Sequence, residues 1–318
     1  MRLLRAELRK LLRPLTYWSV IAVAVTACFL VQQTQGNYEL DHPRHQSPPV
    51  AQPAPSCTVL GLPAGPRCAE IQRGSLQADE RFRREALAAS RLAKAGQQPL
   101  GVGRFAAGLL ASLVGAGALL LLAAGHVGGE WTGRTIKSIL VQDGRRGRLL
   151  LAKVVSLWLV GVALLAVTWA ALALIAPYLA HKYGNPTVTL PVGQAAVTAL
   201  AQSARALLVL AVFAVLGVAA AVLTRNTLGT FFLGFGVVLL SQVLIGIEAV
   251  ARWTPAYWVT GWMRFRQGNV PADYLWTVRP AVGVATPTSP FGLVSLVLFL
   301  GAVGALAWVA FSRSDVTA

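Results

Sequence analysis

The sequence contains several apolar stretches long enough to cross a lipid bilayer, and this restricts the fold more than any other feature. Residues 154–179 contain no charged side chain. A membrane-spanning helix needs about 20 such residues. Only 13% of all residues are charged, whereas soluble domains carry about 25%. Because so little polar surface is available to cover a water-soluble globule, we predict an all-α membrane protein.

Six stretches are predicted to form transmembrane helices. They cover residues 15–31, 105–124, 154–179, 204–223, 229–246 and 291–311. A cleaved signal peptide is the alternative for the first, since a basic segment precedes an apolar core there. Against it, the apolar run continues past Cys28 and the basic segment is long. The last five spans are expected to form one transmembrane domain, residues 101–318.

The distribution of basic residues predicts the orientation of these spans. The net charge is +16, and lysines and arginines gather before the first span and in a loop at residues 127–153. By the positive-inside rule, both segments face the cytoplasm. We therefore expect a multi-pass protein of the cell membrane with cytoplasmic N- and C-termini, and no nucleic-acid partner. Four arginines in the last external connection run against the rule: Arg252, Arg264, Arg266 and Arg279.

Residues 1–14 are predicted to form an amphipathic helix that lies in the membrane interface. At 100° per residue, one face carries only basic side chains and the opposite face carries leucines. Pro14 would end this helix and let the chain turn into the bilayer. The basic face would contact lipid headgroups, and it consists of Arg2, Arg5, Arg9 and Arg13.

Two segments are predicted to lie outside the cell. The first, residues 32–100, holds Cys57 and Cys68 in a stretch rich in Pro and Gly, where a turn and an oxidising exterior favour a disulfide. Within it, charge pairs at helical spacing predict a solvated helix over residues 75–94. The second, residues 248–290, is rich in aromatic residues, which collect at membrane interfaces.

A short re-entrant helix is predicted within this second segment. Thr254 has the side chain of an N-cap, and Pro255 suits the first helical turn. The helix would run over residues 257–266, with Trp258 and Trp262 at the membrane interface. A plain external loop is the alternative.

The loop at residues 127–153 carries the most informative pattern. It contains charged residues, a glycine that permits a turn, and an apolar stripe formed by Ile136, Ile139 and Leu140. Such a short amphipathic helix can dock into a groove of a cytoplasmic partner, although a solvated basic loop explains it as well. His126 and Glu130 could be metal ligands or an acid–base pair, but two ligands do not make a site, and we predict no metal.

The pattern Glu130-x-x-Gly133-x-Thr135-x-Lys137-x-x-Leu140, followed by Arg146 and Lys153, resembles the cytoplasmic loop of ABC-2-type transporter permeases. It departs from that family at Arg134, where Gly and Thr are often adjacent. The resemblance implies that residues of this loop contact an ATPase: Glu130, Gly133, Thr135, Lys137, Leu140 and Arg146. It also implies two copies of a cytoplasmic ABC ATPase, a second permease copy, and an elbow-helix role for residues 1–14.

The sequence contains no Gly-x-x-x-x-Gly-Lys-Ser/Thr phosphate-binding loop, so an exporter of this kind must take its energy from another chain. We expect a permease subunit that moves a hydrophobic or amphipathic substrate outward and is not itself an enzyme. It would bind no cofactor, and the partner would use ATP and Mg²⁺. A secondary transporter is one alternative, disfavoured because the predicted spans offer no chain of carboxylates. A membrane scaffold or sensor that uses the long external loop is another.

Overall fold

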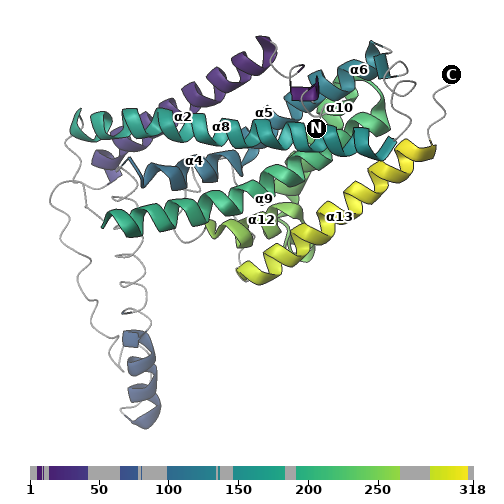
Figure 1. Ribbon diagram of the computed structural model, residues 1–318. Helices are drawn as coiled ribbons and strands as arrows, with labels where there is room; N and C mark the ends of the chain where they lie inside the picture. The colour runs from purple at the N-terminus through teal and green to yellow at the C-terminus, as the bar shows by residue number, and fades with distance from the viewer. Residues whose placement is uncertain are drawn as a thin grey trace.

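A computed structural model describes residues 6–8, 10, 14–41, 65–77, 80, 99–133, 135–136, 146–182, 191–265 and 287–313. Helices account for the regular structure of these residues, and no strand occurs among them (Figure 1). In chain order they are α2 (Pro14–Asp41), α4 (Val102–Leu110), α5 (Leu113–Ala123), the π-helix η1 (Ala124–Gly128), α6 (Gly129–Thr132), α8 (Arg146–Lys182), α9 (Val192–Thr224), α10 (Thr227–Leu244), α11 (Glu248–Ala251), α12 (Pro255–Met263) and α13 (Ser289–Arg313).

Five helical segments in the described parts of the chain are long and apolar enough to cross a membrane. They are Leu113–Thr132, Arg146–Leu179, Val192–Thr224, Thr227–Leu244 and Ser289–Arg313. The predicted first span falls within α2, whose apolar part, Thr16–Leu30, is shorter. The all-helical architecture of a multi-pass membrane protein is therefore supported, with five candidate spans where the sequence predicts six.

The predicted second span is not one continuous helix. It divides into α4 and α5 at Ala111 and Ser112. Ser112 has an extended backbone, and its hydroxyl donates to the Leu109 carbonyl at 2.6 Å and accepts from the Val114 amide at 3.3 Å. The serine side chain thus replaces backbone hydrogen bonds at the break, which is how a break is tolerated inside a membrane.

Two other helices start earlier than predicted. α8 begins at Arg146 rather than near residue 154, so its first two turns take up the end of the loop expected at residues 127–153. α9 begins at Val192 rather than near residue 204. Hydropathy marks only the part of a helix that suits hydrocarbon, and both helices continue beyond that part. The limits of α10 and α13 lie within two residues of the prediction.

α9 is the central helix of the bundle. It contacts α4, α5, α8, α10 and α13. In its apolar 18-residue stretch 78% is buried, whereas only 11% of the corresponding stretch of α13 is buried. Small side chains permit this close packing, since a Cβ added to Gly217 would lie 2.5 Å from the Ala123 Cβ. In Figure 1, α9 runs between α8 and the peripheral α13.

The N-terminus of the predicted re-entrant helix is confirmed. The Thr254 side chain accepts a hydrogen bond from the Tyr257 amide at 3.3 Å, and Pro255 is in the first turn of α12. The helix ends earlier than expected, at Met263, because Arg264 takes a left-handed conformation with φ 53°. α12 packs on α13, α9 and α10.

Several predicted features involve residues outside the described parts of the chain. They include most of the 75–94 helix, although a helix is described at 66–77. Cys68 is disulfide-bonded and Cys28 is free, whereas Cys57 is not among the described residues, so the Cys57–Cys68 bridge stays a prediction. Side chains that also lie outside are those of Arg2, Arg5, Arg9, Arg13, Lys137, Leu140, Arg266 and Arg279.

Candidate functional site

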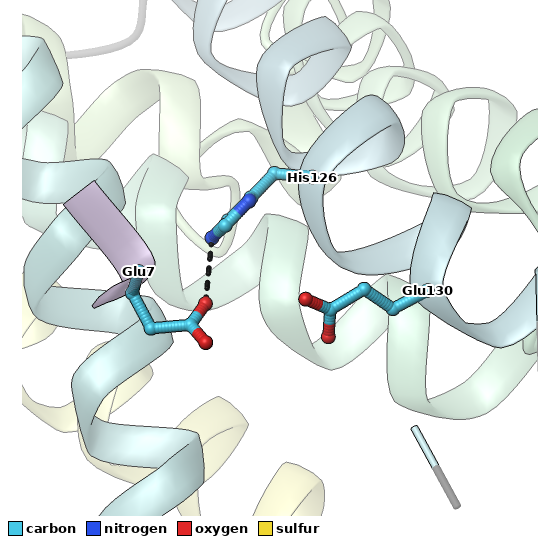
Figure 2. A group of neighbouring side chains, drawn as sticks. All are labelled: Glu7, His126 and Glu130. Carbon is cyan, nitrogen blue, oxygen red and sulfur yellow. Dashed lines mark ion pairs between the residues drawn. The ribbon is translucent and has the colours of Figure 1, made fainter. Parts of the chain in front are cut away.

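Five charged or titratable side chains meet at one end of the bundle, and we call them the ion-pair network. Glu7 Oε2 lies 3.0 Å from His126 Nε2 and 3.1 Å from Lys153 Nζ. Lys153 also contacts Glu130 Oε2 at 2.5 Å. Lys10 Nζ completes the network at 2.9 Å from Glu7 Oε1 and 3.0 Å from Glu130 Oε1. Figure 2 shows the two carboxylates and the imidazole turned toward one another.

Three separate segments supply these side chains. Glu7 and Lys10 share one face of the N-terminal helical segment, three residues apart. His126 lies in η1 and Glu130 in the adjoining α6, so the spacing of four brings both to one side of the same helical rod. Lys153 lies in the first part of α8. The ion-pair network therefore connects the N-terminal segment with the ends of two candidate membrane spans, Leu113–Thr132 and Arg146–Leu179.

Burial makes the charge balance of the ion-pair network important. Glu7 is 1% exposed and Lys153 is 2% exposed. Removing an ion from water costs several kcal/mol unless opposite charges and hydrogen bonds replace the water. Here two carboxylates face two ammonium groups, so the charges of these four side chains cancel. His126 Nε2 approaches Glu7 closely, but it makes no well-directed hydrogen bond in the described structure.

The surroundings of Glu7 lower the pKa of its carboxyl below the ordinary value of 4.5. Burial alone would raise this pKa, but the His126 contact and the charges of Lys153 and Lys10 outweigh burial. A carboxyl with a lowered pKa in the folded state stabilises the fold fully above its unfolded pKa. That contribution is lost as the pH falls through the folded value.

We therefore expect acid to destabilise the chain partly through Glu7. The melting temperature of the purified protein should fall as the pH is lowered from about 7 to about 3, and Glu7→Gln should flatten this fall because it removes the group that gains the proton. Glu248→Gln, at an exposed carboxylate, is the matched control and should leave the slope unchanged. Parallel pH profiles for wild type and Glu7→Gln would contradict the assignment.

The same residues offer a potential set of metal ligands. One ligand atom from each of Glu7, His126 and Glu130 lies within 4.8 Å of the others, and carboxylate and imidazole together suit zinc or a similar ion. However, the ammonium groups of Lys10 and Lys153 already contact both carboxylates. A divalent cation would have to displace a lysine, and we therefore interpret the cluster as an ion-pair network.

The turn that follows Glu130 is held firmly from several sides. Trp131 packs edge-on against Phe311 of α13, with ring centroids 6.3 Å apart, and the Arg225 guanidinium lies 5.5 Å from the Trp131 ring. Thr132 Oγ1 accepts a hydrogen bond from the Thr227 amide at 3.3 Å. The turn is therefore attached to α9, α10 and α13 as well as to the ion-pair network.

The remaining residues of the sequence pattern lie near this turn. Gly133 ends α6, with its amide donating to the Gly129 carbonyl at 2.9 Å. Thr135 donates to the Glu130 carbonyl at 3.3 Å, and both Gly133 and Thr135 are exposed. Arg146 instead donates to the Ser312 carbonyl at 2.8 Å and thereby joins α8 to the end of α13.

Sequence reasoning identified Glu130 and Lys153 but missed their partners in the N-terminal segment. The prediction for that segment used only its arginine face and its leucine face. Glu7 and Lys10 belong to neither face and were given no role. One signal was available, because Glu7 is the only acidic residue before the first predicted span. Glu7 is buried and Glu130 is partly buried, although neither residue lies within a predicted span.

Comparison of the chain with protein-family models, curated proteins and solved structures finds no match. The functional assignment is therefore drawn from the chain's own residues. The ion-pair network and the turn beside it are the two features that an assignment has to explain.

Proposed function

We propose that the chain is the membrane-spanning permease subunit of an ATP-driven ABC exporter. It would lie in the cell membrane with six spans, an interfacial N-terminal helix and both termini in the cytoplasm. The observation that carries this proposal is the exposed turn after the second span, which Glu130 connects to Lys10 and Lys153.

The connections of the turn suit the transmission of a mechanical stroke. Gly133 and Thr135 are exposed at its surface, where a partner can make contact. Glu130 and Trp131 behind them contact the N-terminal segment, α8, α9 and α13. If a partner displaced this turn, the movement would be passed to several of the long apolar helices through packed and ion-paired side chains. Coupling between two sites requires a continuous chain of contacts of this kind.

The partners follow from the same reasoning. The chain has no phosphate-binding loop in its sequence, so ATP and Mg²⁺ would be held by two copies of a cytoplasmic ATPase. A second permease copy would complete the translocation path. A hydrophobic or amphipathic substrate is favoured, because the described helices are predominantly apolar.

The proposal is tested by co-purification. When the full-length chain is purified in mild detergent from its native host, an ABC ATPase should elute with it and hydrolyse Mg-ATP. Gly133→Trp should reduce the amount of bound ATPase at least about tenfold, because a large side chain on the exposed turn obstructs docking by more than about 1.4 kcal/mol. Gly193→Trp is the matched control. Gly193 is exposed at the start of α9, whereas the turn contacts the other end of that helix, and a Cβ at Gly193 would meet no atom within 4 Å.

Two outcomes would contradict the proposal. One is the absence of any ATPase from the wild-type preparation. The other is equal ATPase binding by the Gly133→Trp and Gly193→Trp variants. That result would mean that the turn is a solvated basic loop and does not contact the ATPase.

One observation favours a second candidate, an ion-coupled secondary transporter. Buried carboxylates next to a histidine are typical of proton pathways in membrane transporters, and Glu7 and His126 form such a pair. Reconstituted in liposomes with a pH-sensitive dye, a proton-coupled transporter would dissipate a pH gradient without ATP, and Glu7→Gln would abolish this flux. An ATP-driven permease would show no such flux in either form.

A further inference from the structure

Arg205 lies far from the turn that carries Glu130, near the other end of the uncharged part of α9. It is twenty residues from Arg225, and the residues between these two arginines carry no charge. At 1.5 Å per residue the separation is about 30 Å, the thickness of the hydrocarbon core of a bilayer. Because Arg225 contacts Trp131 beside the turn, Arg205 is expected at the opposite membrane–water interface.

Contacts with α12 hold the Arg205 guanidinium in place. Its Cζ lies 5.7 Å from the centre of the Trp262 ring, and Trp262 Nε1 donates to the Arg205 carbonyl at 2.9 Å. The guanidinium also donates to Gln202 Oε1 at 3.4 Å, while Gln202 Nε2 donates to the Met263 carbonyl at 2.8 Å. A guanidinium that is already positioned loses less freedom when it binds a ligand.

The positive charge of Arg205 meets no carboxylate in the described parts of the chain. The two side chains that it contacts, Gln202 and Trp262, are both neutral. Arg264, directly after α12, is instead close enough to repel it. Arg205 is partly buried, and a partly buried cation beside a second cation is unfavourable unless an anion approaches. The two arginines therefore favour a negatively charged group between them.

The backbone of Arg264 indicates that its side chain is used. Arg264 ends α12 in the left-handed conformation, with φ 53°. Glycine is the usual residue at such a position, because a Cβ crowds the following carbonyl oxygen. Arg264 keeps this unfavourable conformation and presents an exposed side chain. Strained residues of this kind are concentrated at ligand sites, and a bound anion would also explain why Arg264 departs from the positive-inside rule.

The chemistry around Arg205 restricts which anion fits. Guanidinium groups bind phosphate through paired hydrogen bonds, and tryptophan side chains such as Trp262 collect at the depth of lipid headgroups. One and two turns from Arg205 towards the turn, Leu208 and Ala211 are apolar and only partly buried, so an acyl chain can lie along them. Because two positive charges face the phosphate, a lipid of net negative charge fits better than a zwitterionic one.

We infer that Arg205 and Arg264 bind the phosphate group of an anionic phospholipid, with an acyl chain against Leu208 and Ala211. The inference rests on the insertion of α9 and α12 in a membrane and goes beyond the exporter function. Free phosphate offers the same charge without the chain, and the test therefore compares the two.

Photocrosslinking tests the inference on the purified full-length chain in mild detergent. The probe is phosphatidylglycerol with a diazirine in the middle of one acyl chain, and peptide mapping should place its label in α9 close to Ala211. Unlabelled lipids then compete with the probe. Phosphatidylglycerol should compete at least about fivefold better than phosphatidylcholine with the same chains. Inorganic phosphate should not displace the probe.

Arg264→Gly should weaken the binding of phosphatidylglycerol about fivefold, the contribution expected of one arginine near an anionic headgroup. Since glycine adopts the left-handed conformation freely, this variant should melt at or above the wild-type temperature, and weaker binding will not result from unfolding. Arg205→Gln should weaken the binding at least as much.

Arg225→Gly is the matched control. Arg225 caps α9 at the other interface and is also left-handed, with φ 55°. The substitution removes the same charge and relieves the same backbone conformation, and should leave labelling near Ala211 unchanged.

Equal labelling of the Arg264→Gly and Arg225→Gly variants would overturn the inference, and so would labelling that does not reach α9. Equal competition by phosphatidylcholine would contradict the choice of an anionic lipid. Displacement of the probe by inorganic phosphate would show that the two arginines bind a free anion instead. None of these measurements involves an ATPase, so a preparation without ATPase would remove the exporter function and leave the lipid site in place.

Discussion

Replacing Lys153 by methionine is expected to destabilise the folded chain by about 3–5 kcal/mol, the usual cost of removing one partner from a buried ion pair. Lys153 is 2% exposed and contacts both carboxylates of the ion-pair network. Methionine fills a similar volume but brings no charge, so Glu7 and Glu130 would share only Lys10. Unfolding of the purified protein by titration with a denaturing detergent measures the change.

A matched control and a compensating variant separate the charge effect from the packing effect. Arg148→Met removes a positive charge from the same helix at an exposed position and should change the stability by less than about 0.5 kcal/mol. Glu7→Gln combined with Lys153→Met restores the balance of charges and should recover part of the loss. If Lys153→Met unfolds like Arg148→Met, the ion-pair network does not hold the N-terminal segment in place.

The helical membrane architecture could be predicted because length and hydropathy act locally. A run such as residues 154–179 has no other stable arrangement in hydrocarbon, and α8 covers it. The cap of α12 was predictable for the same reason, since Thr254 and Pro255 act on the adjacent turn. Features decided by neighbouring residues can be inferred from one sequence.

The helix break and the ion-pair network are decided by contacts that a single sequence does not display. Serine is common in membrane helices and usually bonds back to its own helix, so Ser112 alone does not predict the division between α4 and α5. Glu7 and Glu130 are far apart in the chain and come together in the fold through their shared contacts with Lys10 and Lys153. The spacing of His126 and Glu130 indicated a shared face but not what faces it.

The break between α4 and α5 leaves no room for a side chain at Gly115 of the second span. A Cβ at Gly115 would lie 1.9 Å from the carbonyl oxygen of Leu110. This oxygen belongs to the backbone, so no side-chain rotation can relieve the clash, and either the break or α5 must move. Gly115→Ala should therefore lower the free energy of unfolding by about 1–3 kcal/mol, the usual cost of overpacking.

Gly117 supplies a matched control on the same helix. A Cβ there would meet only the Phe235 ring at 3.4 Å, an ordinary contact, and alanine favours a helix over glycine by about 1 kcal/mol. Gly117→Ala should therefore be neutral or slightly stabilising in the same detergent titration. Equal stability of the two variants would mean that the second span is a continuous helix.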